Sequence, residues 1–434
     1  MDPYTQKLFS MGLGVEEPWY IRDLDFMEVG DKNGSRHELH VYVEFTKGAR
    51  FSVKGCDEPC PVYDTRERTW RHLNFFQYRC YVHAKVPRVK TPGGEIRTVA
   101  VPWGRDGSGF TLMMEGIILT LCTHMPVRTV AREVGEQDTR LWRVIRHHVR
   151  EALKEQDFSD VSAIGVDEYS HKGHRYITVF LSHPEVLEGT DGKRHQEGKG
   201  CVLFVTEGKD KGAVLRFLSR FIERSGKPEE VKVVTSDMIH GFRNAVREAF
   251  PEAVVTVDKF HVVKNAEDMV DSVRRREMRS KDRRKTEALS GSRYMWLKNP
   301  ENLTDRQRER LEALAGIEYL DTAKAYDMRL RVQHFYQSHA AYDEDLLVDF
   351  ESLALDMVNS PIKEIVRFGE LLTRNAVEIL NYFMTFRTNA ILEGFNSKIS
   401  IIKNRARGFR NMENFTAMIY FVCGNLNLPL APIM

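Results

Sequence analysis

Two aspartates follow short runs of apolar, mostly β-branched residues, which is the pattern of a buried strand that ends in a carboxylate. Residues 163–167 read AIGVD and residues 231–237 read VKVVTSD. Because successive side chains alternate across a strand, Asp167 and its neighbour Glu168 project to opposite faces. We therefore expect Asp167, and not Glu168, to act together with Asp237, and we expect Glu168→Gln to have a mild effect.

Two carboxylates held close together favour a divalent metal site, because they repel each other and Mg²⁺ relieves that repulsion. Two such ions clamp the attacking and leaving oxygens during in-line displacement at phosphorus. The second ion normally needs a third acid, and our candidate is Glu393 in the segment TNAILEGFNSKIS. Helical spacing places Glu393 on one face with Asn389 and Asn396, and the alternative is an ordinary exposed helical glutamate. We predict two Mg²⁺ or Mn²⁺ ions held by Asp167, Asp237 and Glu393.

The segment DKFH adds two titratable residues, Asp258 and His261, near the end of a later predicted strand. Their spacing suits two groups that share one edge of an active site. It suits a structural cap and its partner equally well, so the sequence leaves both alternatives open.

Cysteine and histidine pairs near the amino end have the spacing of metal ligands. Cys56 and Cys60 form one pair, and Cys80 and His83 form a second pair about twenty residues later. Such pairs suit a tetrahedral zinc ion that holds a small module together, so we predict a zinc site from these four residues. His72 competes as a ligand, and the alternative is that the cysteines are reduced thiols beside a core histidine.

Basic side chains gather in two segments although the net charge of the chain is only +2. Residues 274–285 hold eight basic side chains against two acids, and residues 398–410 hold five and no acid. Blocks of this kind suit nucleic-acid backbones, and the alternative for the first block is a solvated helix face. The basic residues that we predict to contact DNA here, together with one in the turn after the first strand, are Lys172, Arg275, Arg276, Lys398, Lys403, Arg405 and Arg407.

Residues 127–153 have the rhythm of a helix-turn-helix, VRTVAREVGEQDTRLWRVIRHHVREAL. Gly135 permits the turn, and Leu141 and Val144 fall on the buried side of the second helix. Outward-facing basic residues are what a recognition helix needs in the major groove, although helix pairs of this kind also occur as plain packing units. The outward residues that we predict to contact DNA are Arg140, Arg143 and His147.

The elements that must position the acids follow a regular order from residue 163 onward. Three strands come first, and a helix, a strand, a helix and a strand follow; their predicted ranges are 163–167, 175–182, 200–208, 212–225, 231–237, 238–250 and 253–263. This order is that of an α/β, ribonuclease-H-like mixed sheet, in which the first and fourth strands are neighbours. Asp167 and Asp237 would then emerge at one place. Residues 264–385 read as almost entirely helical.

Six segments follow from these patterns. They are an N-terminal β segment (1–50), a zinc-finger-like module (51–105), a helix-turn-helix (106–157), the first part of the ribonuclease-H-like core (158–285), a large all-helical insertion (286–385), and a C-terminal helix that completes the catalytic core, with a tail (386–434). Strands are predicted within the first segment at 20–29 and 37–46.

Composition excludes several classes of protein. No signal peptide and no apolar run of membrane-spanning length is visible, and six cysteines in 434 residues do not form a disulfide framework. We expect a cytoplasmic protein with no membrane partner.

With these residues identified, the sequence resembles the DDE transposases of bacterial insertion sequences, specifically the ISL3 family. The resemblance covers almost the whole chain and rests on many segments in order, among them RHLNFFQYRCYVHAKVPRV, VPWGRDGSGFT, GEQDTRLWRV, IGVDEYSHKGHRY, SDMIHGFRNAV, DKFHVVK, WLKNPENLTDRQRERL and TNAILEGFNSKISIIKNRARGFRNMENF. It implies that Asp167, Asp237 and Glu393 are the DDE triad, and that the helical stretch between Asp237 and Glu393 is an insertion in the ribonuclease-H-like fold. It also implies that a zinc-finger-like region and a helix-turn-helix read terminal inverted repeats, and that the protein is bacterial and associated with the nucleoid. One departure concerns the zinc, because relatives often carry another cysteine-containing pair where this chain reads KTPGGE (90–95).

The predicted activity is metal-dependent hydrolysis of a phosphodiester at the element end, followed by attack of the freed 3′-hydroxyl on target DNA. The predicted partners are double-stranded DNA, as terminal inverted repeats and as target, and further copies of the chain in a dimer or larger assembly. The alternatives are a non-catalytic repressor derived from a transposase and a structure-selective nuclease of the same fold.

Overall fold

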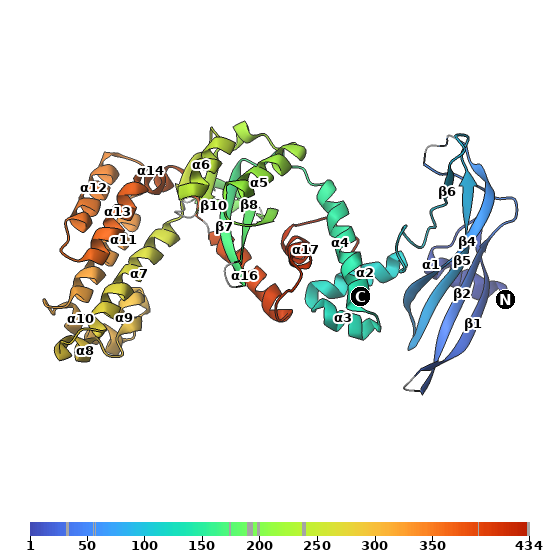
Figure 1. Cartoon of the computed structure of the whole chain (residues 1–434), viewed down its shortest axis with the longest axis horizontal. Helices are drawn as coiled ribbons and strands as arrows, with labels where there is room; N and C mark the ends of the chain where they lie inside the picture. The colour runs from blue at the N-terminus through green and yellow to red at the C-terminus, as the bar shows by residue number, and fades with distance from the viewer. Residues whose placement is uncertain are drawn as a thin grey trace. The chain divides into compact units, whose positions relative to one another are not determined.

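The computed structural model describes residues 1–31, 34–54, 56, 58–172, 175–188, 194–197, 200–236, 240–388 and 390–431. These residues divide into two compact units (Figure 1). The first, which we call the N-terminal unit, contains residues 1–154 and the segments Asn404–Phe421 and Leu426 onward. The second, the pocket unit, contains residues 155–403 and Val422–Asn425. Across the described residues, no helix has both the length and the apolar composition that crossing a bilayer requires.

A six-stranded sheet dominates the N-terminal unit. Its strands are β1 (Trp19–Asp31), β2 (Gly34–Phe45), β3 (Arg50–Phe51), β4 (Cys60–Phe75), β5 (Tyr78–Lys90) and β6 (Ile96–Thr98), preceded by helix α1 (Pro3–Leu13). The strand order is β1-β2-β5-β4-β3, with β6 beside β5, and β2 runs parallel to β5 while the other pairs are antiparallel. The strands predicted at 20–29 and 37–46 are confirmed. The predicted boundary at residue 50 is wrong, because it falls inside this single sheet.

One face of this sheet forms the core of the unit. Leu39 and Val41 in β2 and Val82 in β5 are completely buried, because alternate residues of each strand point to the same side. The opposite face carries polar and aromatic rings, among them His40 and His83, which stack on each other at 5.0 Å between ring centroids.

The predicted helix-turn-helix is confirmed as a helical pair. Helix α2 (Leu112–His124) precedes α3 (Val127–Val134) and α4 (Asp138–Lys154). Gly135 ends α3 with φ of +69°, a left-handed conformation that glycine adopts without strain. Leu141 and Val144 of α4 are buried, as their spacing predicts.

The pocket unit contains a five-stranded mixed sheet with the order β11-β8-β7-β12-β13. Its strands and the helices that connect them are β7 (Ala163–Lys172), β8 (Arg175–Ser182), β11 (Val202–Glu207), α5 (Lys211–Glu223), the short 3₁₀ turn Pro228–Glu230, β12 (Val233–Ser236), α6 (His240–Ala249) and β13 (Val254–Val257). Strands β7, β8 and β11 are antiparallel, and β7, β12 and β13 are parallel. The predicted neighbourhood of the first and fourth strands is therefore confirmed, with Thr235 paired to Gly165.

Three local predictions about this sheet need correction. Strand β7 continues to Lys172 and does not stop at residue 167. A small pair of strands, β9 (Glu185–Glu188) and β10 (Arg194–Glu197), was not predicted. The last strand ends at Val257, because Asp258 begins a helix, α7 (Lys259–Met278).

The two faces of the sheet are covered differently. Helices α5 and α6 lie against one face (Figure 1), where Phe180 and Phe217 stack at 4.1 Å beside the buried Ile164 and Val166. The other face meets helix α16 (Ala390–Arg405), whose Leu392 lies close to Gly165.

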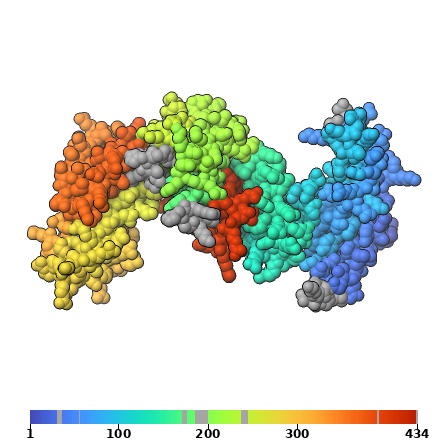
Figure 2. Space-filling view, viewed as in Figure 1, coloured from blue at the N-terminus to red at the C-terminus, as the bar shows by residue number. Residues whose placement is uncertain are grey.

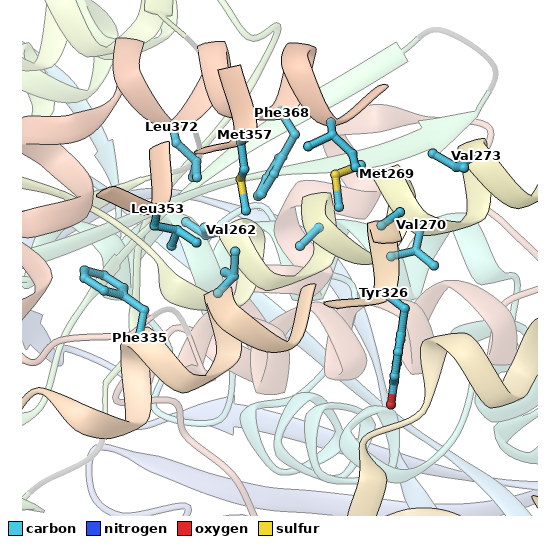
Figure 3. Close-up of a cluster of buried hydrophobic side chains, with 14 of the residues drawn as sticks. Val262, Met269, Val270, Val273, Tyr326, Phe335, Leu353, Met357, Phe368 and Leu372 are labelled. Atoms are coloured by element: carbon cyan, nitrogen blue, oxygen red, sulfur yellow. The ribbon is translucent and has the colours of Figure 1, made fainter. Parts of the chain in front are cut away.

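The helical part of the pocket unit, yellow to orange in Figure 2, starts at Lys259, five residues before the helical sequence predicted from residue 264 and well before the predicted segment boundary at 286. After α7 it contains α8 (Arg283–Leu289), α9 (Arg293–Leu297), the 3₁₀ turn Pro300–Asn302, α10 (Asp305–Ala315), α11 (Asp321–Ser338), α12 (Glu344–Val358), α13 (Lys363–Arg374), α14 (Ala376–Leu380) and α15 (Tyr382–Thr385). Figure 3 shows its core, where Val270 of α7, Phe335 of α11, Met357 of α12 and Phe368 of α13 converge. The chain ends with α17 (Met412–Cys423).

Candidate active site

A pocket of about 690 Å³ lies between β7, the first turns of α7 and helix α16. Each of the three elements contributes polar side chains to it. The lining residues are Asp167, Glu168, Phe260, His261, Lys264, Glu393, Asn396, Ser397, Ser400 and Ile401. Two of the three predicted acids, Asp167 and Glu393, therefore line one pocket although they are far apart in the sequence.

The carboxylate of Asp167 is held in a defined orientation. Asn396 donates a hydrogen bond from Nδ2 to Oδ2 of Asp167 at 2.5 Å, and the backbone N–H of Glu168 donates to Oδ1 at 2.7 Å. The flanking Val166 is buried against α5 and α6, so Asp167 projects on the face of Gly165, as the alternation predicts. Fixed hydrogen bonds of this kind orient a carboxylate toward a ligand.

Glu168 differs from its neighbour. Its Oε2 lies 3.7 Å from Nζ of Lys209, and its side chain is mostly buried while contributing to the rim of the pocket. Glu168 therefore has a cationic partner within the protein, and Asp167 has its hydrogen bonds on the side of α16.

Glu393 is exposed and lies in the first turn of α16. Asn396 follows it by three residues, so the two side chains share one helical face, as predicted. Asn389 and Asp237, which complete the predicted set, lie outside the described residues. In the sequence, Asp237 directly follows Ser236, the last residue of β12.

The two alternatives for Asp258 and His261 separate in the structure. Asp258 is buried and is the N-cap of α7, and its side chain accepts a hydrogen bond from the backbone N–H of Phe260 at 3.3 Å. His261 lines the pocket together with Lys264, one helical turn later. Asp258 is thus the cap, and the pocket-facing residues of the DKFHVVK segment are Phe260, His261 and Lys264.

The donor chemistry of the pocket fits a hard divalent cation. Asp167, Glu393 and Asn396 offer oxygen ligands, which Mg²⁺ and Mn²⁺ prefer, and Lys264, Ser397 and Ser400 offer donors to phosphate oxygens. In the part of the chain that the structure describes, which excludes Asp237, no three histidine, cysteine or acidic residues converge closely enough to hold a metal ion. Lys264, Ser397 and Ser400 were not predicted; the helical spacing of His261 and Lys264 was the available signal.

The four predicted zinc ligands do not come together, so these four residues do not form one site in the structure. Cys60 pairs with Phe51 at the start of β4, and Cys80 pairs with His72 near its end. Cys60 and His72 are twelve positions apart in β4, which corresponds to roughly 40 Å along the strand. Distance along one long hairpin therefore separates residues that the sequence spacing seemed to group.

Cys80 and His83, the second predicted pair, lie on opposite faces of β5. Cys80 lies on the buried face, and burial raises the pKa of its thiol to about 11. His83 lies on the opposite face, where it forms hydrogen bonds with His40 at 2.8 Å and with Thr69 at 2.9 Å. The competing ligand His72 is also committed, because its Nδ1 lies 2.9 Å from the hydroxyl of Thr111 and burial lowers its pKa to about 4.

Protein contacts occupy the end of the hairpin beside Cys56 and Cys60. Arg88 donates from Nε to Asp64 at 2.6 Å, and Arg97 donates to the carbonyl of Lys54. The turn at 91–95 closes on itself, since the N–H of Thr91 donates to the carbonyl of Glu95 at 2.8 Å. This turn holds no cysteine or histidine.

The predicted DNA contacts in α4 fall into two groups. Arg143 is exposed. Arg140 is not free for a ligand, because it donates to Glu136 at 2.5 Å and its guanidinium lies 4.2 Å from the ring centroid of Phe110. His147 is partly buried, and burial and the nearby Arg105 lower its pKa, which favours the neutral imidazole.

The first basic segment is largely neutralised by acids of its own unit. Arg275 lies 3.2 Å from Asp271, and Arg276 lies 2.9 Å from Asp321 and 3.0 Å from Glu364. The prediction that these two arginines contact DNA is therefore not supported by their geometry. The described side chains of this segment that are exposed and have no carboxylate within 4.0 Å are Arg279 and Lys281.

The second basic segment is more open. Lys398, Arg405 and Arg407 are exposed, although Lys398 also lies over the ring of Phe395 at 5.0 Å. Lys403 is partly buried and donates to the carbonyl of Ser170 at 3.4 Å. The side chain of Lys172 lies outside the described residues.

Comparison with known proteins gives three matches along the chain. A family model described as a transposase, from the ISL3 group with a DDE domain, matches residues 164–419. A helix-turn-helix domain of transposase family ISL3 matches residues 99–149, and a zinc-finger of the transposases IS204, IS1001, IS1096 and IS1165 matches residues 55–90. The last match covers the hairpin in which the four predicted ligands are separated.

Curated relatives match over nearly their full length. The transposase for insertion sequence element IS1557 of Mycobacterium tuberculosis is 25% identical over 447 residues, which cover 95% of this chain and 94% of the relative. The transposase for insertion sequence element IS1001 of Bordetella parapertussis is 27% identical over 392 residues, which cover 87% of this chain and 89% of the relative.

Proposed function

Because this chain belongs to the ISL3 family of insertion-sequence transposases, we propose that it cleaves and joins DNA at a site built from Asp167, Asp237 and Glu393. The observation that carries the proposal is the convergence of Asp167 and Glu393 on one pocket, beside Asn396 and Lys264. Asp237 enters as a proposal from the family resemblance and from its position directly after β12.

We propose a ribonuclease-H-like core for this site. The support is the sheet order β11-β8-β7-β12-β13, with three antiparallel strands followed by two strands parallel to β7. In such a sheet the acids emerge from the two adjacent parallel strands, and a later helix brings the third. Here that helix would be α16.

The chain's own residues would orient the acids and the DNA strand. Asn396 of α16 would orient Asp167 through its hydrogen bond to Oδ2. Glu393 is exposed on the same face of α16 and would share a cation with Asp167. Lys264, Ser397 and Ser400 would bind the non-bridging oxygens of the scissile phosphate. When bound, Mg²⁺ or Mn²⁺ supplies a water nucleophile of lowered pKa and stabilises charge at phosphorus.

The helix-turn-helix would bring the element end to this site. Arg143 is the exposed basic side chain on the predicted recognition face of α4, and a basic side chain in that position suits a base edge or phosphate in the major groove. Synapsis of two element ends would make the working form a dimer or a larger assembly on DNA.

The test uses labelled duplex carrying the inverted repeats that flank the gene, with Mg²⁺ and the full-length protein. Wild-type protein should give nicked and joined products, and Asp167→Asn should lose both by about 10³-fold while still binding the duplex. Nicked products without joined ones would favour the structure-selective nuclease. Full cleavage by Asp167→Asn would overturn the assignment of the acid, and binding without any cleavage by wild-type protein would favour the repressor.

A further inference from the structure

One partly buried residue, His183, contacts both of the parallel strands that lead to the pocket. Its Nε2 lies 2.7 Å from the hydroxyl oxygen of Thr235 in β12. Its backbone N–H donates to the carbonyl of Ala163, the first residue of β7, at 3.0 Å. His183 directly follows β8, so it links the end of one strand to the two strands beyond it.

The same imidazole also lies against the place where α16 meets the sheet. A methyl group added at Gly165 would lie 2.9 Å from Nε2 of His183, closer than real side chains approach, and 3.0 Å from Cδ1 of Leu392, a tight contact that the leucine would have to relieve by moving. Leu392 is only 1% exposed. The absence of a side chain at Gly165 is therefore what lets His183 and Leu392 share this space.

A second glycine completes the contact with α16. A methyl group at Gly200 would overlap the side chain of Ile391 and the carbonyl oxygen of Ser182. Ile391 and Leu392 are the two residues that immediately precede Glu393. The first turn of α16 is thus seated against the sheet through two side chains that fit over two glycines.

Gly165, Thr235 and Leu392, which surround His183, lie within two residues of the three proposed acids in the sequence. Gly165 and Asp167 share a face of β7, because they are two residues apart in one strand. Thr235 precedes Asp237 by two residues in the sequence, and Leu392 precedes Glu393 by one. Thr235 and Gly165 are themselves paired in the parallel register.

We infer that His183, Gly165 and Thr235 form a positioning seat, which sets the distance between the acid of β7 and the acid of α16. The inference rests on the proposed function, since it concerns the same acids. These three residues do not touch the substrate or the ions; they act through the elements that carry the acids. A metal site needs its ligands held to within about 0.5 Å, and a buried hydrogen bond with close packing supplies that precision.

A general role in the hydrophobic core explains these contacts less well. An apolar side chain at position 183 would fill the same volume without placing a polar ring in a site that is largely closed to water, which is costly unless its hydrogen bond is made. The hydrogen bond to Thr235 fixes both the direction and the separation of the two elements, which apolar packing does not. Crowding at Gly165 points the same way, because alanine there would displace either His183 or α16.

The experiment compares Gly165→Ala with a matched glycine elsewhere in the same unit. A methyl group at Gly369 in α13 would lie 2.8 Å from Cβ of Met357 and 2.9 Å from the backbone nitrogen of Val358, so it creates a similar overlap. Gly369 belongs to the helical core and does not line the pocket. Both variants are measured as full-length protein, with the free energy of unfolding determined for each.

Three readouts separate positioning from plain stability. Gly165→Ala should cleave element-end DNA at least about 10-fold more slowly at saturating DNA, whereas Gly369→Ala should cleave at nearly the wild-type rate when equally folded. Without DNA, calorimetric titration with Mn²⁺ should show weaker binding for Gly165→Ala and unchanged binding for Gly369→Ala. The affinity for end DNA should stay within about threefold of wild type for both, since neither change lies in the helix-turn-helix.

Normal cleavage and normal Mn²⁺ binding by folded Gly165→Ala would overturn the inference, and so would an equal loss in Gly369→Ala. If Gly165→Ala does not fold, Thr235→Val tests the inference instead, because valine keeps the volume of threonine and removes the hydroxyl that contacts His183. Thr235→Val should cleave slowly, and Thr235→Ser, which keeps a hydroxyl, should cleave normally. Asp167→Asn separates the two proposals. If Asp167→Asn is inactive and the Gly165 and Thr235 variants are normal, only the seat is wrong; if Asp167→Asn is fully active, the proposed function itself fails.

Discussion

The pocket and the β4–β5 hairpin differ in how sequence spacing relates to distance in space. Asp167 and Glu393 are far apart in the sequence, and they line the same pocket. Cys60 and Cys80 are close in the sequence, and they lie near opposite ends of one long hairpin. Both sets were predicted as metal ligands from residue type and spacing.

The difference teaches that residue type alone does not define a ligand set; the geometry of the supporting elements does. Asp167 on β7 and Glu393 in the first turn of α16 line one pocket because α16 packs on the face of β7 that carries Gly165, whatever the separation of the two acids in the sequence. A two-stranded antiparallel hairpin brings together only residues that are equally distant from its turn. Cys60 and Cys80 are not, and Cys80 and His83 face opposite sides of the same strand.

The largest expected effect is that of pH on stability. Each unit contains a partly buried histidine that is hydrogen-bonded to a threonine, His72 to Thr111 and His183 to Thr235. Burial lowers the pKa of His72 and of His183 to about 4, from an ordinary value of 6.5. The folded state therefore keeps both rings neutral, and the unfolded state takes up protons first. The free energy of unfolding is therefore highest above pH 6.5. Each histidine lowers it by on the order of 3 kcal/mol as the pH falls from 6.5 to 4.

Chemical unfolding followed between pH 7.5 and pH 4 checks this expectation. His72→Phe should flatten the pH dependence of the N-terminal unit, and His183→Phe should flatten that of the pocket unit. A pH dependence that survives in both variants would show that other groups control acid stability in both regions.

The next effect concerns the pocket alone. Asn396→Ala removes the donor that orients Asp167, so we expect the cleavage rate to fall about 10²-fold at saturating DNA, with little change in unfolding free energy. Asn404→Ala is a matched control, because Asn404 is exposed on the same helix and does not line the pocket. Cleavage assays with end DNA in Mg²⁺ measure both. A normal rate for Asn396→Ala would mean that the hydrogen bond does not organise the site.

Much of the pocket was predictable from the sequence, and the reasons are physical. Apolar runs of strand length gave the order of the central sheet, and side-chain alternation assigned Asp167 to the face of α16. The start of α7 was missed, because the run AVVTVDKFHVV is apolar enough to continue as a strand, and only the cap at Asp258 converts it to a helix. His261 was consequently assigned to a strand, although it lies in the first turn of α7.

The hairpin was less predictable for a different reason. Strand register depends on partners that the sequence does not specify locally, and a long hairpin can be drawn with its turn at several positions. The parallel pairing of β2 with β5 joins segments on both sides of the predicted boundary at residue 50. Long-range pairing of this kind leaves no local signal, so the sequence did not show that one sheet spans this boundary.

A smaller effect tests whether the unit that contains the hairpin still binds DNA through α4. Arg143→Ala should weaken binding of the terminal repeat about 10-fold, because an exposed basic side chain on the recognition face is lost. Arg140→Ala should instead lower the stability of the unit, since Arg140 bonds to Glu136 and covers the ring of Phe110. Titrations at fixed salt, with random duplex as the control, separate the two. If Arg143→Ala and wild type prefer the repeat over random duplex equally, another surface of the protein must recognise the repeat.

The smallest expected effect is that of a metal chelator on the stability of the chain. It tests directly whether the hairpin, unlike the pocket, fails to bring its predicted metal ligands together. A structural zinc site contributes on the order of 10 kcal/mol to folding, so a protein that depends on one unfolds in chelator. Here Asp64, Arg88 and Arg97 close the end of the hairpin beside Cys56 and Cys60 by protein contacts. We therefore expect the purified chain to hold well under one zinc per molecule, and its unfolding midpoint to be the same with and without chelator. Cys56→Ser combined with Cys60→Ser should cost about 1 kcal/mol, as expected for a buried thiol replaced by a hydroxyl. One zinc per chain, lost together with stability in chelator, would mean that the hairpin gathers its ligands in a way its register does not indicate.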